Sequence, residues 1–165
     1  MIRRFLKDRR ASAAAEFALS LPMMLALLFG GMEAGHFFWT EHKLVKSVRD
    51  GARFASRIDV NSVCDGPTRR STPDIDALIQ NLTVTGRIDG GGVPKVPGWA
   101  AADVDVAIDC EAFVGTGIYT DLGAAGPMVT VSSGAVDYPS ILNGLGVIDD
   151  TVQISAESSA AVAGI

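Results

Sequence analysis

The sequence contains few histidines, cysteines and basic residues, and each shortage argues against a class of function. Two histidines and two cysteines in 165 residues make a poor zinc site, and the cysteines are too far apart for a C-x-x-C redox motif. Residues 58–165 contain four basic and fourteen acidic residues, a net charge of −10, which argues against binding of a nucleic-acid backbone. Five basic residues and one acid give residues 1–10 a net charge of +4. The length suits one globular domain.

A run without charge follows the basic N-terminus and predicts a membrane-inserted helix. No charged residue occurs from Phe17 to Met32, a run that would be about 24 Å long as a helix. Adding Ala11–Ala15 beyond Glu16 extends it to about 33 Å, against a hydrocarbon core of about 30 Å. The positive-inside rule then predicts a cytoplasmic N-terminus and a body on the far side of the membrane. A secretory signal peptide that is removed after Gly35 is the alternative.

The helix is expected to continue beyond the membrane. Apolar residues recur at helical spacing on one face of the next segment, at Leu44, Val48, Ala52 and Ala55. Charged residues occupy the opposite face, at Lys46, Asp50, Arg53 and Arg57. One helix over residues 12–56 would be roughly 65 Å long, with a kink at Pro22, which removes one backbone hydrogen bond. The aromatic run Phe37–Trp39 lies where such a helix would leave the hydrocarbon.

The residues after position 57 have the pattern of a β-rich body. Apolar and polar residues alternate over Asp103–Cys110 and Val152–Val162, and more weakly over Asn81–Ile88 and Pro127–Ser133. Alternation with one polar face is typical of an antiparallel sheet that is covered on one side. We expect the apolar face of Leu44–Ala55 to be that cover. The predicted fold is therefore α+β, a long transmembrane and amphipathic N-terminal helix packed on a C-terminal antiparallel sheet.

Two short helices are also predicted in the body. One begins with Thr72 as N-cap and Pro73 in its first turn. The other covers Pro139–Leu142 and ends at Gly144 or Gly146. The predicted organisation is a basic leader at residues 1–11, the N-terminal helix at 12–57 and the exported body at 58–165.

The two cysteines are predicted to form a disulfide. Cys64 and Cys110 both lie in the exported body, where thiols are oxidised, and Cys110 falls on the apolar face of its strand. Closing a loop of this size would stabilise the fold by roughly 4 kcal/mol on the chain-entropy estimate. Two buried free thiols are the alternative.

Other candidate sites are better explained as ordinary surface or structural residues. The acids of one strand lack the glycine turn of a calcium loop and fit a solvated strand face; they are Asp103, Asp105, Asp109 and Glu111. His36 and His42 are six residues apart on a helix and point in different directions. No Ser–His–acid grouping stands out. We therefore expect no enzymatic activity, no cofactor and no metal.

Glu16 at the start of the apolar run has two interpretations. It either marks the membrane boundary or lies inside an apolar helical assembly, where a carboxylate needs a cationic partner. If the chain is cut between Ala11 and Ser12, the new α-amino group of a neighbouring copy could supply that cation.

Three runs together resemble one protein family. They are RRASAAAEFALSLP at residues 9–22, GGMEAG at 30–35 and RDGARFA at 49–55. The combination is similar to the TadE-like minor pilins and pseudopilins of the tight-adherence (Tad/Flp) type IV pilus. The resemblance implies a pilin-like fold, cleavage by a prepilin peptidase between Ala11 and Ser12, and an assembly role for Glu16 and Phe17. Prepilins usually have Gly before the cut, where this chain has Ala11.

The resemblance also implies a function, partners and a location. The function is that of a non-enzymatic minor pilin or pseudopilin, which supports assembly, priming or the tip of a Tad pilus for surface adhesion. The partners would be the major pilin, other minor pilins, the prepilin peptidase, the inner-membrane assembly platform and membrane lipid. The chain would cross the inner membrane once, with its body periplasmic, or extracellular in a pilus. A membrane-anchored exported binding module, an adhesin or sensor outside any filament, is the alternative.

Overall fold

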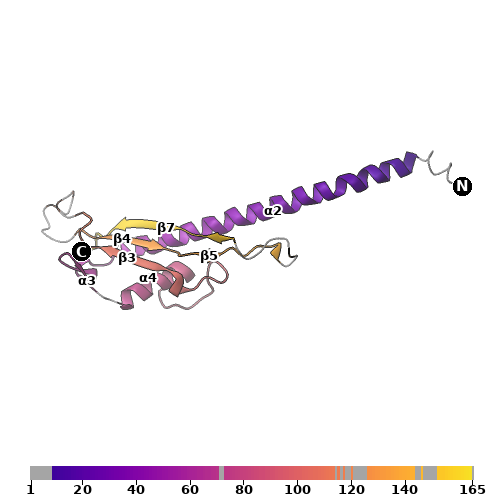
Figure 1. Ribbon diagram of the computed structural model, residues 1–165. Coiled ribbons are helices and arrows are strands. Elements are labelled where there is room, and N and C mark those ends of the chain that lie inside the picture. Colours follow the sequence, from indigo (N-terminus) through magenta and orange to yellow (C-terminus); the bar gives the residue numbers. More distant parts are fainter. Residues whose placement is uncertain are drawn as a thin grey trace.

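A long helix and a small body built on its far half make up the protein (Figure 1). The computed structural model describes residues 9–70, 73–113, 115, 117, 120, 126–143, 146 and 152–164, without the side chains of residues 9–12. The helices are α2 (Arg9–Ala55), α3 (Val60–Val63), α4 (Pro73–Thr85) and the 3₁₀ helix η1 (Ala101–Asp103). The strands are β1 (Cys64–Asp65), β2 (Thr68–Arg69), β3 (Asp105–Asp109), β4 (Met128–Ser132), β5 (Val136–Asp137), β6 (Gln153–Ile154) and β7 (Glu157–Ala161). The predicted α+β fold is confirmed.

α2 confirms the predicted long helix and the amphipathic character of its second half. Although Pro22 lies inside α2, Figure 1 shows one unbroken helix rather than two segments. The predicted apolar face is the most buried part of the helix, with exposed fractions of 2% or less at Leu44, Val48, Ala52 and Ala55. On the opposite side, Lys46 and Arg53 are exposed.

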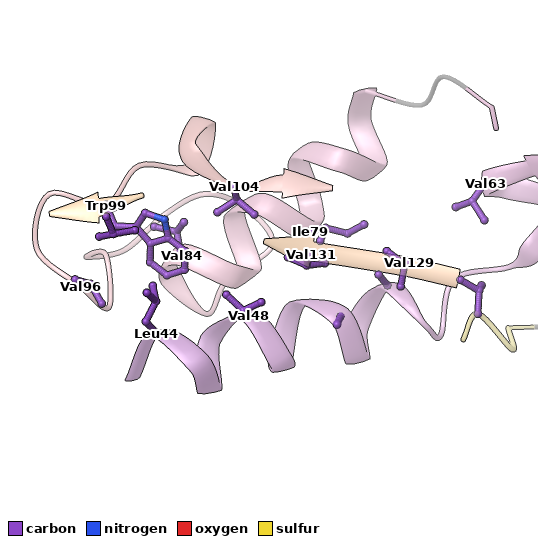
Figure 2. Packing of buried hydrophobic residues seen from close by; sticks show 14 of the residues in the cluster. Leu44, Val48, Val63, Ile79, Val84, Val96, Trp99, Val104, Val129 and Val131 are labelled. Atoms are coloured by element: carbon purple, nitrogen blue, oxygen red, sulfur yellow. The ribbon is translucent and has the colours of Figure 1, made fainter. Parts of the chain in front are cut away.

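The core forms where α2, α4 and the main sheet meet. β3, β4 and β7 make an antiparallel sheet in that order, with Val106 opposite Val131. α2 contacts β4, β7 and α4, so α4 shares with α2 the cover that the sequence assigned to α2 alone. In Figure 2, Val48 points from α2 toward the region where Ile79 of α4 and Val131 of β4 lie, and all three are fully buried.

The predicted strand over Asn81–Ile88 is wrong, because α4 continues to Thr85. Apolar and polar residues alternate weakly here and so predicted a strand, yet the threonine hydroxyls are satisfied within the helix. Thr83 Oγ1 donates to the Ile79 carbonyl at 2.7 Å, and Thr85 Oγ1 donates to the Asn81 carbonyl at 2.9 Å. Thr83 therefore fits into the core although it is polar and β-branched.

The other predicted strands are confirmed with one change. Residues 103–110 and 127–133 contain β3 and β4, with Asp105 and Asp109 on the exposed face. The predicted strand Val152–Val162 is divided into β6, which pairs with β5, and β7, which pairs with β4. The buried Ser133 accounts for the break, because its Oγ accepts the Ala156 N–H at 2.9 Å and its own N–H donates to the Ala156 carbonyl at 2.9 Å.

The two predicted short helices have different outcomes. α4 begins at Pro73 with Asp74 and Asp76 in its first turn, as predicted, whereas the proposed cap Thr72 lies outside the described residues. The predicted helix over Pro139–Leu142 is wrong, since residues 139–142 contain a turn and no α-helix. Gly144, one of its two proposed ends, lies outside the described residues.

The predicted disulfide is confirmed. Cys64 at the start of β1 is bonded to Cys110 after the end of β3, with 5.9 Å between the Cα atoms. Both residues are buried in the core. The bond joins the segment after α2 to the main sheet, and so ties the β1–β2 hairpin to the rest of the body.

Replacing Val48 with Asp should destabilise the body strongly, because a carboxylate would be buried without a partner between α2, α4 and the sheet. We expect a loss of more than about 2 kcal/mol in the free energy of unfolding. The measurement is denaturant unfolding of the full chain in detergent, followed by the fluorescence of the buried Trp99. Arg53→Ala, on the exposed side of α2, should remain within about 0.5 kcal/mol of wild type. Equal stability of the Val48→Asp protein would contradict the packing described.

Gly51→Ala should also destabilise the fold, for a steric reason. A Cβ at Gly51 would overlap Thr83 Oγ1, which is buried and bonded to the Ile79 carbonyl. Overpacking of this kind costs about 1–3 kcal/mol and outweighs the gain of about 1 kcal/mol in helix propensity. Gly35→Ala is the matched control, because no atom lies within 4 Å of the position that its Cβ would take. The same unfolding measurement should show it as stable as wild type or more so, and a reversed ranking would refute the close contact.

Candidate assembly site

The N-terminal half of α2 presents an apolar surface on all sides. Every side chain from Ala13 to Met32 is exposed. The large apolar residues among them include Phe17, Leu19, Met23, Met24, Leu27 and Leu28, each at least 60% exposed. Apolar surface of this extent marks contact with a membrane or with other proteins. α2 is long and apolar enough to cross a bilayer, and is therefore a candidate single-pass membrane anchor.

The four residues predicted for processing and assembly lie together near the start of α2. Ala11 and Ser12 are helical, and their side chains lie outside the described part of the chain. Glu16 and Phe17 are exposed, on the part of α2 that projects away from the body (Figure 1). Ser12 and Glu16 are four residues apart, about 6 Å along the helix axis. A contact made by these residues with another molecule would leave the body accessible.

Glu33, the first acid after the charge-free run, is held against the body. The residue is only 7% exposed. Oε2 accepts the backbone N–H of Leu142 at 3.3 Å, and the Glu33 carbonyl accepts the hydroxyl of Tyr138 at 3.3 Å. The segment that follows β5 therefore lies against α2 at the end of the apolar run.

Tyr138 contacts two further residues of α2. Its hydroxyl lies 2.9 Å from Nδ1 of His36, and its ring packs edge-on against Phe37 with 5.2 Å between ring centroids. Burial raises the pKa of Tyr138 to about 12, and the nearby Glu33 carboxylate contributes to the shift. The phenol therefore stays neutral at physiological pH and keeps its hydroxyl proton for hydrogen bonding.

This contact between α2 and the body was missed by the sequence analysis. His36 was interpreted as an ordinary structural residue, which agrees with its bond to Tyr138, but its partner was not foreseen. Tyr138 is 102 residues from His36 and 105 from Glu33, and neither periodicity nor spacing links residues so far apart. An acid directly after the charge-free run was the one available signal.

The described residues also bear on metal binding. No group of three or more His, Cys, Asp or Glu side chains in them is placed to hold a metal ion. The acids of β3 point to solvent in the exposed positions of the strand. That the protein needs no metal or cofactor stays a prediction.

Comparison with known proteins gives one match. Residues 11–53 match the model of the TadE-like protein family. The match lies within α2 and includes Ala11, Ser12, Glu16 and Phe17. It agrees with the resemblance found in the sequence. Neither a search of curated proteins nor a search of solved structures finds a match to the chain.

Tyr138→Phe should loosen the contact between the body and α2. Removing the hydroxyl deletes its bonds to His36 and to the Glu33 carbonyl, a change worth about 0.5–1.5 kcal/mol for each hydrogen bond. Hydrogen–deuterium exchange of the full chain in detergent should become faster in residues 136–143. Ser159→Ala, which removes the exposed hydroxyl contact with Thr130, is the control and should not change exchange there. Unchanged protection in Tyr138→Phe would show that the hydroxyl does not hold this segment.

Proposed function

We propose that the protein is a non-enzymatic minor pilin or pseudopilin that supports assembly, priming or the tip of a Tad/Flp-type pilus for surface adhesion. The observation that carries the proposal is the exposed apolar half of α2, which lies within the residues matched by the TadE-like family. A helix that is apolar on all sides is stable in lipid or among similar helices, and not in water.

The proposed topology follows from the charge distribution. The basic residues at positions 3–10 favour a cytoplasmic N-terminus, and the body with its disulfide then lies in the periplasm. A prepilin peptidase would cut between Ala11 and Ser12, and the inner-membrane assembly platform, the major pilin and other minor pilins would be the partners. Removal of a signal peptide after Gly35 is less consistent with this structure, because it would discard Glu33 and its contacts with the body.

Glu16 is proposed to direct assembly through its charge. In a bundle of apolar helices its carboxylate can pair with the Ser12 α-amino group of a neighbour, but only after the leader is removed. Opposite charges attract more strongly away from water, while a buried charge without a partner is strongly unfavourable. Arrangements that keep Glu16 away from this amino group would therefore be disfavoured, so that the pair selects the axial register between neighbouring helices.

Glu16→Ala should reduce incorporation into pili without affecting the body. Membrane insertion and the disulfide should be unchanged, because Glu16 lies on the projecting part of α2 (Figure 1). Glu16→Asp should restore incorporation only in part, since its side chain is one methylene shorter. The amount of each variant is compared between membranes and sheared filaments by quantitative mass spectrometry, which also reports the mature N-terminus.

Ser20→Ala is the matched control. Ser20 is exposed one turn further along α2, and its hydroxyl donates to the Phe17 carbonyl at 3.1 Å. Normal incorporation of Glu16→Ala would reject the pairing model and leave Glu16 as a boundary residue. Absence of the wild-type chain from filaments and from their assembly complex would reject the pilin function itself, and would favour a membrane-anchored binding module.

A further inference from the structure

An apolar groove runs along α2 where the helix meets the body. Its volume is about 680 Å³, within the usual range for ligand-binding pockets. One wall is the α2 face that includes Ala26, Gly30, Glu33 and Phe37, and the other is formed by Tyr138, Leu142 and Val152. From Ala26 to Phe38 the groove follows α2 for about 18 Å. One end therefore belongs to the exposed apolar segment, and the other end lies beside the body.

Glu33 is the one charged residue among the described residues that line this groove. The residue is more than nine-tenths buried, and Oε2 accepts the Leu142 N–H. Oε1 is buried and has no hydrogen-bond partner in the described part of the chain. The hydroxyls of Ser140 and Tyr138 and the nearby His36 help to stabilise the charge of this carboxylate. A buried carboxylate oxygen without a donor of its own is still unfavourable, so the groove is suited to a ligand that brings a cationic N–H donor to Oε1.

We propose that the groove binds a phospholipid with a primary ammonium headgroup, such as phosphatidylethanolamine, with the ammonium at Glu33 Oε1 and an acyl chain along Ala26 and Gly30. This rests on the proposed membrane-spanning role of α2. If residues 17–32 lie in the hydrocarbon, Glu33 is the first residue beyond it, at the level of the lipid headgroups. A single lipid molecule then satisfies both the apolar and the charged parts of the groove.

The free oxygen favours a primary ammonium over a quaternary one. Both headgroups carry a positive charge, and the aromatic rings in the groove (Phe29, Phe37, Phe38 and Tyr138) would attract either of them. The primary ammonium has N–H donors for Oε1, whereas a trimethylammonium group has none. Phosphatidylcholine with identical acyl chains is therefore a matched probe, differing from phosphatidylethanolamine only at the headgroup nitrogen.

The test is native mass spectrometry of the full-length protein, released from nanodiscs that contain equal amounts of the two lipids. The wild type should retain phosphatidylethanolamine about tenfold more than phosphatidylcholine, as expected for one hydrogen bond to a charged group. Glu33→Gln keeps the shape of the side chain and should reduce the preference to near unity. Gly30→Leu should lower retention of both lipids, because its side chain enters the groove, and nothing within 4 Å of its Cβ position opposes folding.

Gly31→Leu is the matched control for Gly30→Leu, since Gly31 is also unobstructed but does not line the groove. Equal retention of the two lipids by wild type, preference for phosphatidylcholine, or unchanged selectivity in Glu33→Gln would overturn the proposal. So would photo-crosslinking from position 29 to a second membrane protein in place of retained lipid, which would assign the groove to a protein helix. Carbonate extraction of wild-type membranes tests anchoring separately, so a loss of lipid selectivity leaves the pilus proposal intact.

Discussion

The contact of one α2 face with α4 and the sheet is the interaction on which the body depends. Leu44, Val48 and Ala52 supply a ridge that is almost completely buried, and Gly51 lets α4 approach until the Thr83 side chain lies against the α2 backbone. α4 and the strands β4 and β7 are each too small to bury their own apolar faces. They are stable because they share this one helix as a common support, and the disulfide fixes the β1–β2 hairpin to the same core.

The helices and strands could be predicted from sequence where their pattern repeats over neighbouring residues, and not where they depend on contacts between distant residues. The face from Leu44 to Ala55 and the alternation in β3 are repeated patterns over neighbouring residues, so they identified the helix and strand correctly. Residues 81–85 have the same local appearance as a strand, but helical burial of Ile79 and Thr83 against α2 overrode the β propensity of the segment. The division between β6 and β7 depends on the hydroxyl of Ser133, a residue from a distant part of the chain.

The candidate site shows the same limit. Ala11, Ser12, Glu16 and Phe17 were identifiable because they belong to a short contiguous motif that the family match also covers. Glu33 is recognisable in the sequence only as the first acid after the charge-free run. Its burial depends on Tyr138 and Leu142, and only the folded structure brings those residues to α2.

Glu16 and Glu33 delimit the apolar half of α2 at a spacing that fits a bilayer. Glu33 follows Glu16 by seventeen positions, which is about 26 Å along the axis, slightly less than a hydrocarbon core of about 30 Å. A helix of this length crosses with little tilt, or with slight local thinning of the bilayer. Because the segment after β5 is hydrogen-bonded to Glu33 and His36, a bilayer around the apolar run would have the body close to its surface. In that setting the length of the apolar run would determine the height of the body, while the contacts of Tyr138 with His36 and Glu33 hold this part of the body against one side of α2.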